Sequence, residues 1–331
     1  MQGFEWQTRL GVCTYSYGIH WRAARTNTPD LPFTNLSQFL DVCHGIGAAG
    51  VQIGLDNTSA ETADEIRRKC GFYHLYFEGI VSLPKDNSDT ERFERDIRTA
   101  KAAGAAVVRS AALSGRRYET FDSADAFREF ATRSIRSIAL AEPILKRNRV
   151  KLALENHKDW RVPELLDLLK RFDSEYIGIC VDTGNSIALL EDPMKVIEAY
   201  APFAFSVHLK DMALRPYGDG FLLAEVPLGE GMLDIPAMVA LLLKANPRVW
   251  LNLEMITRDP LKVPCLTDKY WAAMSGVPAS ELAATLGLVK RNDSTKPLPG
   301  TSELDLLAQL ALEEENVRRS FAYAQFGATG P

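Results

Sequence analysis

The feature that most constrains the fold of this chain is a repeated alternation of short apolar runs with longer amphipathic segments. The runs are rich in β-branched residues and too short for helices, so each predicts a buried strand. The spacing of the runs suits one strand and one helix per repeat. The predicted strands cover residues 10–14, 50–53, 79–83, 105–110, 151–155, 176–182, 204–208 and 249–254.

The segments between the runs have the periodicity of helices that bury one face. The clearest of them cover residues 61–70, 90–103, 124–146, 162–172 and 235–243. Repeated strand–helix units favour either a doubly wound sheet or a closed barrel. Eight units favour the barrel, and the first run, LGVCTYSYG, lacks the G-x-G-x-x-G turn of a nucleotide-binding sheet. We therefore predict an α/β fold, a (β/α)8 TIM barrel over residues 1–256.

Residues 257–331 are more than a last barrel helix requires. A long helix is predicted over residues 302–322, with acidic residues early and basic residues late, as the helix dipole favours. The prolines around residues 297–299 indicate a linker before it. We expect a C-terminal helical extension that packs on the barrel or on a neighbouring subunit, and a homo-oligomer is an open alternative.

Composition excludes several classes of protein. The formal net charge is −5 and no block of basic residues occurs, which disfavours a nucleic-acid partner. No uncharged apolar stretch is long enough to span a membrane, and the N-terminus has no export-signal pattern. The five cysteines are odd in number and lack a CxxC pair, so we expect reduced, buried thiols and a cytoplasmic location.

Polar residues end the last four apolar runs, at Glu155, Asp182, His208 and Glu254. In a barrel these positions meet at the C-terminal rim, where active sites of this fold are built. Strand alternation supports this arrangement, because residues two positions earlier must also point inward. Those predicted inward residues are small or polar, namely Ala153, Cys180, Ser206 and Asn252. The intervening residues, predicted to pack outward, are Leu154, Val181, Val207 and Leu253.

Three clustered carboxylates would repel one another, and a divalent cation is the natural counter-charge. Oxygen ligands with one imidazole suit Mn²⁺, the ion we expect, with Mg²⁺ or Co²⁺ as alternatives. A set with one histidine and no cysteine does not indicate structural zinc. The sequence therefore predicts a metal site formed by Glu155, Asp182, His208 and Glu254.

Five motifs carry a family resemblance: ALENH at 153–157, VDTGN at 181–185, SVHLKD at 206–211, GEGMLD at 229–234 and LNLEM at 251–255. In order and spacing they resemble the sugar phosphate isomerase/epimerase superfamily, the xylose isomerase-like TIM barrels. The resemblance implies that the four residues named above bind the metal. It also implies that Glu155 and Glu254 transfer protons. In the ketose 3-epimerases a histidine follows the matching aspartate by three residues, whereas this chain has Asn185, so substrate contacts made there cannot be carried over.

Several side chains near the ligands are candidates for contact with substrate. His157 lies two residues beyond Glu155 and could act as a second acid or base. Each candidate can also be explained without a substrate, as a solvated lysine, a turn residue or part of a hydrophobic cluster. The candidates for substrate binding are Lys158, Asn185, Lys210, Glu230, Trp21 and Trp160.

The favoured function is a metal-dependent isomerase or epimerase of a small sugar or keto-sugar, working by proton abstraction and a metal-stabilised enediolate. The alternative is a lyase of the same superfamily, either a keto-sugar dehydratase or a 3-oxo-glycoside eliminase. A DNA-repair endonuclease is disfavoured, because that branch needs several histidines at the site and many phosphate contacts. This chain has five histidines, only two of them near the predicted site, and a negative net charge. A non-catalytic sugar-binding barrel is a remote alternative.

Overall fold

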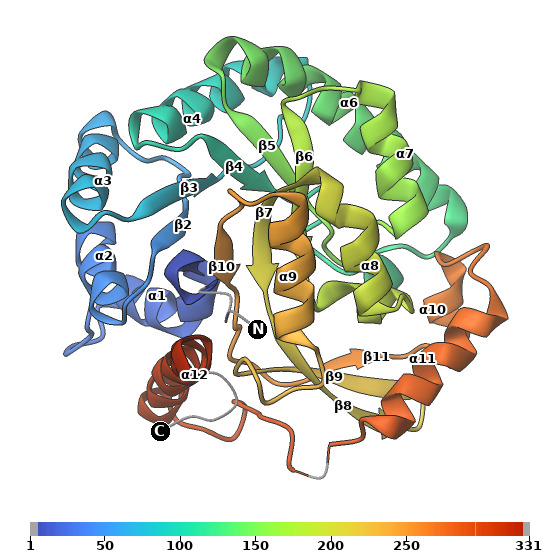
Figure 1. The fold of residues 1–331 in the computed structure, drawn as a ribbon. Coiled ribbons are helices and arrows are strands. Elements are labelled where there is room, and N and C mark those ends of the chain that lie inside the picture. Colours follow the sequence, from blue (N-terminus) through green and yellow to red (C-terminus); the bar gives the residue numbers. More distant parts are fainter. Residues whose placement is uncertain (1–5, 295, 327–331) are drawn as a thin grey trace.

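The computed structural model describes residues 6–294 and 296–326. Its centre is a closed barrel of parallel strands in the order β1-β10-β7-β6-β5-β4-β3-β2, which confirms the predicted (β/α)8 fold (Figure 1). The barrel strands are β1 (Leu10–Cys13), β2 (Gly50–Gly54), β3 (Tyr76–Ile80), β4 (Val107–Ser110), β5 (Lys151–Glu155), β6 (Ile177–Asp182), β7 (Ala204–Leu209) and β10 (Leu251–Leu253).

Helices surround this barrel and alternate with its strands (Figure 1). They are α1 (Gly18–Arg25), α2 (Leu36–Gly45), α3 (Ala60–Tyr73), α4 (Thr90–Ala102), α5 (Arg117–Thr120), α6 (Ala124–Asn148), α7 (Val162–Phe172), α8 (Pro193–Tyr200) and α9 (Ile235–Ala245). Local signals fix several helix ends. Ser59 and Ser123 cap α3 and α6 by accepting hydrogen bonds from backbone N–H groups.

The alternation predicted for the last four strands holds. The four residues predicted to point outward belong to the main hydrophobic core, together with residues of the surrounding helices. Asn252, predicted like Ser206 to point inward, donates a hydrogen bond to Oγ of Ser206 on the neighbouring strand at 3.2 Å. The barrel interior is therefore polar beneath its C-terminal rim, and side chains fill it.

One strand differs from the prediction. The third apolar run was expected at residues 79–83, but β3 covers Tyr76–Ile80, so Glu78 lies inside the barrel wall. The Tyr76 hydroxyl donates to the carbonyl of Leu251 at 2.7 Å. The approach leaves no room beside Gly11, where an added Cβ would lie 2.2 Å from the Tyr76 hydroxyl. The Tyr76 ring thus forms part of the barrel floor.

A second sheet follows β7, in a region that none of the predicted strands or helices covers. The antiparallel strands β8 (Asp211–Tyr217) and β9 (Gly220–Val226) form a hairpin, and β11 (Leu261–Val263) pairs with β9. The turn at Gly218–Asp219 between two apolar segments was the signal for this hairpin.

The C-terminal extension joins the same hydrophobic core as the barrel. It contains β11, α10 (Asp268–Ala272), α11 (Ala279–Arg291) and α12 (Leu306–Phe326). Helix α12 begins four residues later than predicted and packs against α1 and the 3-10 helices Trp6–Arg9 and Thr14–Tyr17. Val317 and Phe321 of α12 lie in the main core.

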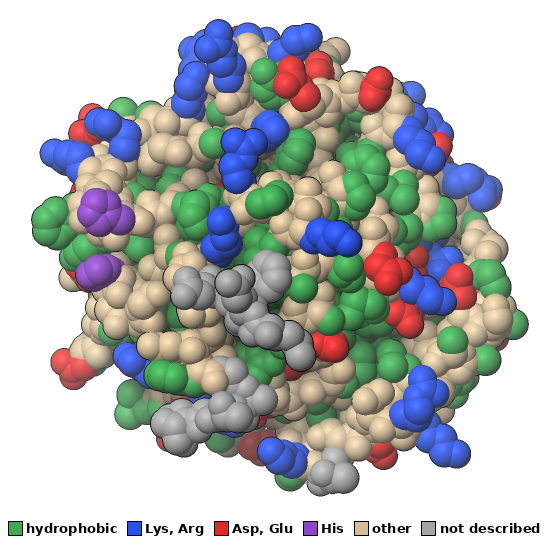
Figure 2. Space-filling view, in the orientation of Figure 1, with side chains coloured by type: hydrophobic (Ala, Val, Ile, Leu, Met, Phe, Trp, Pro, Cys, Tyr) green, Lys and Arg blue, Asp and Glu red, His purple; other side chains and the backbone are tan. Residues whose placement is uncertain are grey.

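Among the described residues, none of the helices is long and apolar enough to cross a membrane. All five cysteines are free and buried, as predicted. The face seen in Figure 2 carries Lys and Arg side chains spread among Asp and Glu side chains. The expectation that no export signal is present rests partly on residues 1–5, which lie outside the described residues.

Candidate functional site

The structure brings the four predicted ligands together at the C-terminal ends of their strands. The ligand atoms of Glu155, Asp182, His208 and Glu254 all lie within 4.8 Å of one another. All four side chains are at most 3% exposed. Nδ1 of His208 lies 3.3 Å from the Glu254 carboxylate and 3.5 Å from that of Glu155. We call these four residues the ligand cluster.

Two buried atoms of the ligand cluster, Oδ2 of Asp182 and Nδ1 of His208, make ion pairs at 3.2 Å with Lys210 and at 3.3 Å with Glu254 but no hydrogen bond. The other carboxylate oxygen of Asp182 accepts from the backbone N–H groups of Gly184 and Asn185 at 2.9 and 2.8 Å. Unpartnered buried polar atoms are costly unless a ligand satisfies them. Three carboxylates and one imidazole, with these two atoms left without hydrogen bonds, fit a divalent cation.

The electrostatics of the ligand cluster also favour positive charge. Burial lowers the pKa of His208, but Cys180, Glu254 and Glu155 outweigh it and raise that pKa well above its usual value. Burial raises the pKa of Glu254, yet His208 and Lys210 hold it well below its usual range. Without an ion the cluster thus favours the protonated form of His208, and a bound divalent cation would compete with that proton.

Arg109, on β4, was missed by the sequence reading and contacts the ligand cluster directly. Its Nε donates to Oε2 of Glu155 at 2.5 Å, and its Nη2 donates to the same oxygen. Burial raises the pKa of Glu155, but Arg109 and His208 lower it overall. The available signal was a charged residue inside the apolar run AAVVRS.

Lys210 is the second cation in contact with the ligand cluster. Its Nζ lies 2.6 Å from the Glu254 carboxylate, 3.2 Å from Asp182 and 3.3 Å from Glu225. Glu225 comes from β9 and also accepts from Arg258 at 2.7 Å. The hairpin that the sequence reading missed therefore supplies a buried carboxylate to the site.

Asn185 links the ligand cluster to a second buried lysine. Its Nδ2 donates to Oε1 of Glu155 at 3.1 Å, and its Oδ1 accepts from Nζ of Lys158. Lys158 is 2% exposed. Burial and then Lys210 lower the pKa of Lys158 to about 8. Sequence candidates Lys158, Asn185 and Lys210 thus lie together beside the ligand cluster.

His157 lies apart from the hydrogen bonds of the ligand cluster. Its Nδ1 is 3.2 Å from the carbonyl oxygen of Gly115, to which it donates in the neutral form. Burial and then Lys158 lower the pKa of His157 to about 3, so the ring is neutral at pH 7. A neutral imidazole can accept a proton but is a poor donor of one.

Glu230 is directed away from the ligand cluster. It is exposed, and its carboxylate accepts from Arg319 of α12. The two glycines beside it wrap a different carboxylate, because Gly229 and Gly231 both donate backbone N–H groups to Asp211 at 2.9 Å. The GEG motif therefore forms a turn around Asp211, and a substrate contact by Glu230 has no support in this geometry.

The two tryptophans predicted to bind substrate, Trp21 and Trp160, lie in different surroundings. Trp160 is 5% exposed and packs on Phe127 and Phe130, with ring centroids 5.7 Å away in each case. Trp160 is thus part of a hydrophobic cluster, which was the alternative to substrate contact in the sequence analysis. Trp21 is half-buried and lines a cavity of about 740 Å³ together with Tyr15.

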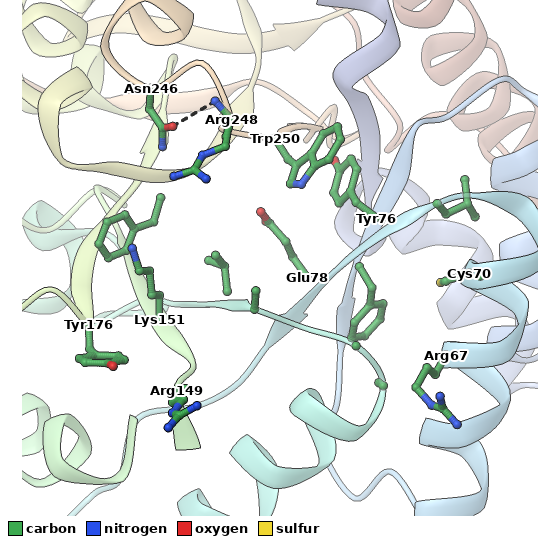
Figure 3. A pocket seen from close by; sticks show the side chains of 18 of the residues that line it. Arg67, Cys70, Tyr76, Glu78, Arg149, Lys151, Tyr176, Asn246, Arg248 and Trp250 are labelled. Atoms are coloured by element: carbon green, nitrogen blue, oxygen red, sulfur yellow. Dashed lines mark hydrogen bonds between the residues drawn. The ribbon is translucent and has the colours of Figure 1, made fainter. Parts of the chain in front are cut away.

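A cavity of about 610 Å³ adjoins the ligand cluster, since Arg109 lines it and contacts Glu155. Tyr15 and Asp56 line both this cavity and the one beside Trp21. A third cavity, of about 650 Å³, lies at the opposite end of the barrel and is lined by Glu78, Lys151 and Trp250 (Figure 3). The first cavity thus reaches the ligand cluster through Arg109, and the second shares two lining residues with the first.

Comparison with known proteins places this architecture in a family. The sequence pattern of the xylose isomerase-like TIM barrels matches residues 40–274. The chain belongs to this family. The family match spans most of the barrel, including all four residues of the ligand cluster.

A curated relative, the 3-oxo-isoapionate decarboxylase of Pectobacterium atrosepticum, is 27% identical over 236 residues, which cover 69% of this chain and 78% of the relative. The solved structure of an L-ribulose 3-epimerase matches with a TM-score of 0.57 and 15% identity, covering 87% of this chain and 99% of the epimerase. The IOLI protein with a bound zinc atom matches with a TM-score of 0.55 and 16% identity, covering 87% and 100%. At these identities the two structures support the fold.

Proposed function

We propose that this protein is a metal-dependent lyase that removes the carboxyl group of a small oxo-sugar acid. The observation that carries the proposal is the pair of buried lysines, Lys158 and Lys210, beside the ligand cluster. A neutral sugar needs neither ammonium group, whereas a substrate carboxylate is a natural partner for both.

Counting charges supports an anionic substrate. The buried carboxylates of the site are balanced by an equal number of cations, because Arg109, Lys158, Lys210 and Arg258 stand against Glu155, Asp182, Glu225 and Glu254. A bound divalent ion with neutral His208 would leave an excess of positive charge. Uncompensated buried charge is costly, so an anion is favoured in the remaining space.

The ion that we propose is Mn²⁺, with Mg²⁺ or Co²⁺ as alternatives, held by the ligand cluster. When bound, it would act as a Lewis acid on the carbonyl oxygen of the substrate. The lysines would orient the carboxylate that leaves. The bond between that carboxylate and the neighbouring carbon breaks, its electron pair enters the enolate, and carbon dioxide departs.

A proton must then return to carbon. Lys158 is suited to deliver it, because a pKa of about 8 lets the ammonium group give up its proton near neutral pH. The name of the curated relative, 3-oxo-isoapionate decarboxylase, describes a reaction of this type for that protein. The relative therefore supports a lyase as the proposed function, in place of the isomerase that the sequence favoured.

An isomerase or epimerase of a keto-sugar is the second candidate. Glu155 and Glu254 supply two carboxylates in one buried site, so one could take a proton from carbon and the other return it. The L-ribulose 3-epimerase has the same fold. Both candidates share an enolate and differ in what leaves the substrate.

The test is to incubate the Mn²⁺-loaded protein in D₂O with 3-oxo-sugar acids and, separately, with neutral ketoses. A lyase releases carbon dioxide from the acids and places deuterium on the carbon that carried the carboxylate. An isomerase changes the ketoses without loss of carbon. A chelator-treated sample is the control. Failure to convert either class, or conversion that survives chelation, would refute metal-dependent chemistry on oxo-sugars.

A further inference from the structure

A polar layer lies directly beneath the ligand cluster, inside the barrel. It consists of Gln52, Glu78, Ser206 and Asn252, which come from four different strands and are each at most 2% exposed. Polar side chains are costly in a barrel core, so each must be satisfied by its neighbours. Which group donates and which accepts can be assigned for each hydrogen bond of this layer. The last of these assignments concerns His208.

Glu78 accepts three hydrogen bonds through a single oxygen. Its Oε2 receives Oγ of Ser206 at 2.6 Å, Nε2 of Gln52 at 3.0 Å and Nδ2 of Asn252 at 3.0 Å. Its other oxygen, Oε1, is buried without a hydrogen-bond partner. In Figure 3 the Glu78 side chain extends from β3 toward the cavity at the opposite end of the barrel. Oε2 thus acts as the acceptor of all three hydrogen bonds, and any proton on this carboxyl group would lie on Oε1.

This requirement sets the orientation of the Gln52 amide. Because Nε2 of Gln52 donates to Glu78, its carbonyl oxygen Oε1 must face the other way, and it lies 2.7 Å from Nε2 of His208. A carbonyl oxygen only accepts, so Nε2 of His208 must carry a hydrogen. In a neutral ring the lone pair then resides on Nδ1, the atom that faces the ligand cluster.

We propose that Glu78 and Gln52 are positioning residues that hold His208 with Nε2–H toward the barrel floor and Nδ1 toward a bound metal ion. The proposal rests on the metal site of the proposed function. If Gln52 were reversed, its amino group would meet Nε2 of His208, and a hydrogen would move to Nδ1, where it blocks coordination. Glu78 disfavours the reversed state, because its carboxylate accepts a hydrogen bond from the amino group of the Gln52 amide.

The first test is Gln52→Leu, which keeps approximate volume and removes the acceptor. Mn²⁺ and Zn²⁺ affinities are measured by competition calorimetry, and the His208 ring is followed by ¹⁵N NMR in the diamagnetic Zn²⁺ form. Loss of such supporting bonds typically weakens metal binding about 10- to 100-fold. We expect that loss, together with faster solvent exchange of the His208 Nε2–H. With five histidines in the chain, the ring signals can be assigned.

A rescue experiment separates positioning from packing. The double variant Gln52→Glu with Glu78→Gln keeps one carboxylate and one amide in the layer, but exchanges their places. The carboxylate can then accept from His208, and the amide can donate to it, so metal affinity should recover to within about threefold of wild type. Glu78→Gln alone permits the reversed Gln52 amide and should show an intermediate affinity.

Ser206→Ala is the matched control. It removes a 2.6 Å hydrogen bond to Glu78 and the weaker 3.2 Å bond that Ser206 accepts from Nε2 of Gln52. It leaves the 3.0 Å bond from Gln52 to Glu78 and the contact between Gln52 and His208 in place. Its stability should fall while its metal affinity stays within about threefold of wild type. Equal loss of affinity in Ser206→Ala and Gln52→Leu, or an unchanged His208 signal in Gln52→Leu, would overturn the positioning role.

Failure of the proposed function would look different. In that case the wild-type protein would bind the divalent ion but convert no substrate, whereas a protein that binds no ion would overturn both ideas. The His208 Nε2–H signal of the metal-free protein would still be protected from exchange, and Gln52→Leu would still expose it. The two ideas can thus fail independently.

Discussion

Nζ of Lys210 lies 2.6 Å from Oε2 of Glu254, so a buried ammonium group already contacts one of the four ligands predicted for a metal ion. The same nitrogen lies 3.2 Å from Asp182. Lys210 therefore partly neutralises the carboxylates that would attract the ion, while adding positive charge for an anionic substrate. Lys210 should therefore weaken binding of the ion and strengthen binding of an anionic substrate, and the two effects can be measured separately.

Lys210→Met should tighten Mn²⁺ binding and weaken catalysis. Removing a unit charge within a few ångströms of the ligands changes ion binding by more than 1.4 kcal/mol, or about tenfold, even at an effective dielectric constant of about 20. We expect kcat/KM for the oxo-sugar acid to fall at least about 100-fold. Lys262→Met, at an exposed position on β11, is the control. Weaker Mn²⁺ binding by Lys210→Met would contradict this account of the charges.

Removing the metal should lower the melting temperature. An ion that binds only the folded state stabilises it by about 2.7 kcal/mol when its free concentration is a hundred times Kd. Calorimetric melting before and after chelator treatment measures this contribution, and elemental analysis identifies the ion. Added Mn²⁺ should restore the original curve. Identical curves with no bound metal would exclude a resident ion.

Glu254→Gln should separate ligation from proton transfer in the second candidate function. The amide keeps one oxygen for coordination but cannot act as a base, so isomerase turnover should drop by several orders of magnitude while measurable metal binding remains. In the lyase the same variant loses mainly metal affinity, and excess Mn²⁺ should recover much of the rate. Turnover at saturating Mn²⁺ therefore reports which reaction operates.

Activity should decline as the pH rises through about 8. Burial and Lys210 place the pKa of Lys158 near that value, so its ammonium group is present below pH 8 and is lost above it. A bound cation would lower this pKa further. The profile of kcat/KM against pH should therefore have a basic limb at or below about 8. In Lys158→Arg the charge persists, and this limb should move upward; an unmoved limb would assign it to another group.

Glu313→Ala should destabilise the attachment of α12. Glu313 is 1% exposed and accepts from the backbone N–H groups of Ile19 and His20 at 2.7 and 2.9 Å, and it lies 2.8 Å from Nδ1 of His20. Leaving these buried donors without a partner should cost about 2–4 kcal/mol. Denaturant unfolding measures the loss, with the exposed Glu315→Ala as control. A loss no larger than the control's would mean that α12 is held by apolar packing alone.

Much of the barrel could be predicted because the period of the apolar pattern is local information. The α7 boundaries, Val162–Phe172, follow from periodicity, a proline at the helix start and basic residues at its end. Strand β3 was misplaced because its first residues, Tyr76, Phe77 and Glu78, do not form an aliphatic run. That shift concealed Glu78, whose burial depends on the strand register.

Some residues of the candidate site could likewise be predicted from the sequence, and others could not. Glu155, Asp182 and His208 were found because a polar residue that ends an apolar strand is visible along the chain. Arg109 was not found, because its role depends on Glu155, which is 46 residues away in the sequence and lies on the neighbouring strand. Glu225 was hidden in a segment for which no strand was predicted.

The sequence by itself determined the repeating strand–helix units, the four strand-end ligands and the inward phase that they share. These are consequences of 2.0- and 3.6-residue periods, which a single segment carries without reference to the rest. Only the tertiary structure decided which charges meet. The pairing of Lys210 with Glu254, the chain from Glu78 through Gln52 to His208, and the turning of Glu230 toward α12 all require closure of the barrel. Electrostatic energy depends on distance through space, and distance along the chain does not specify it.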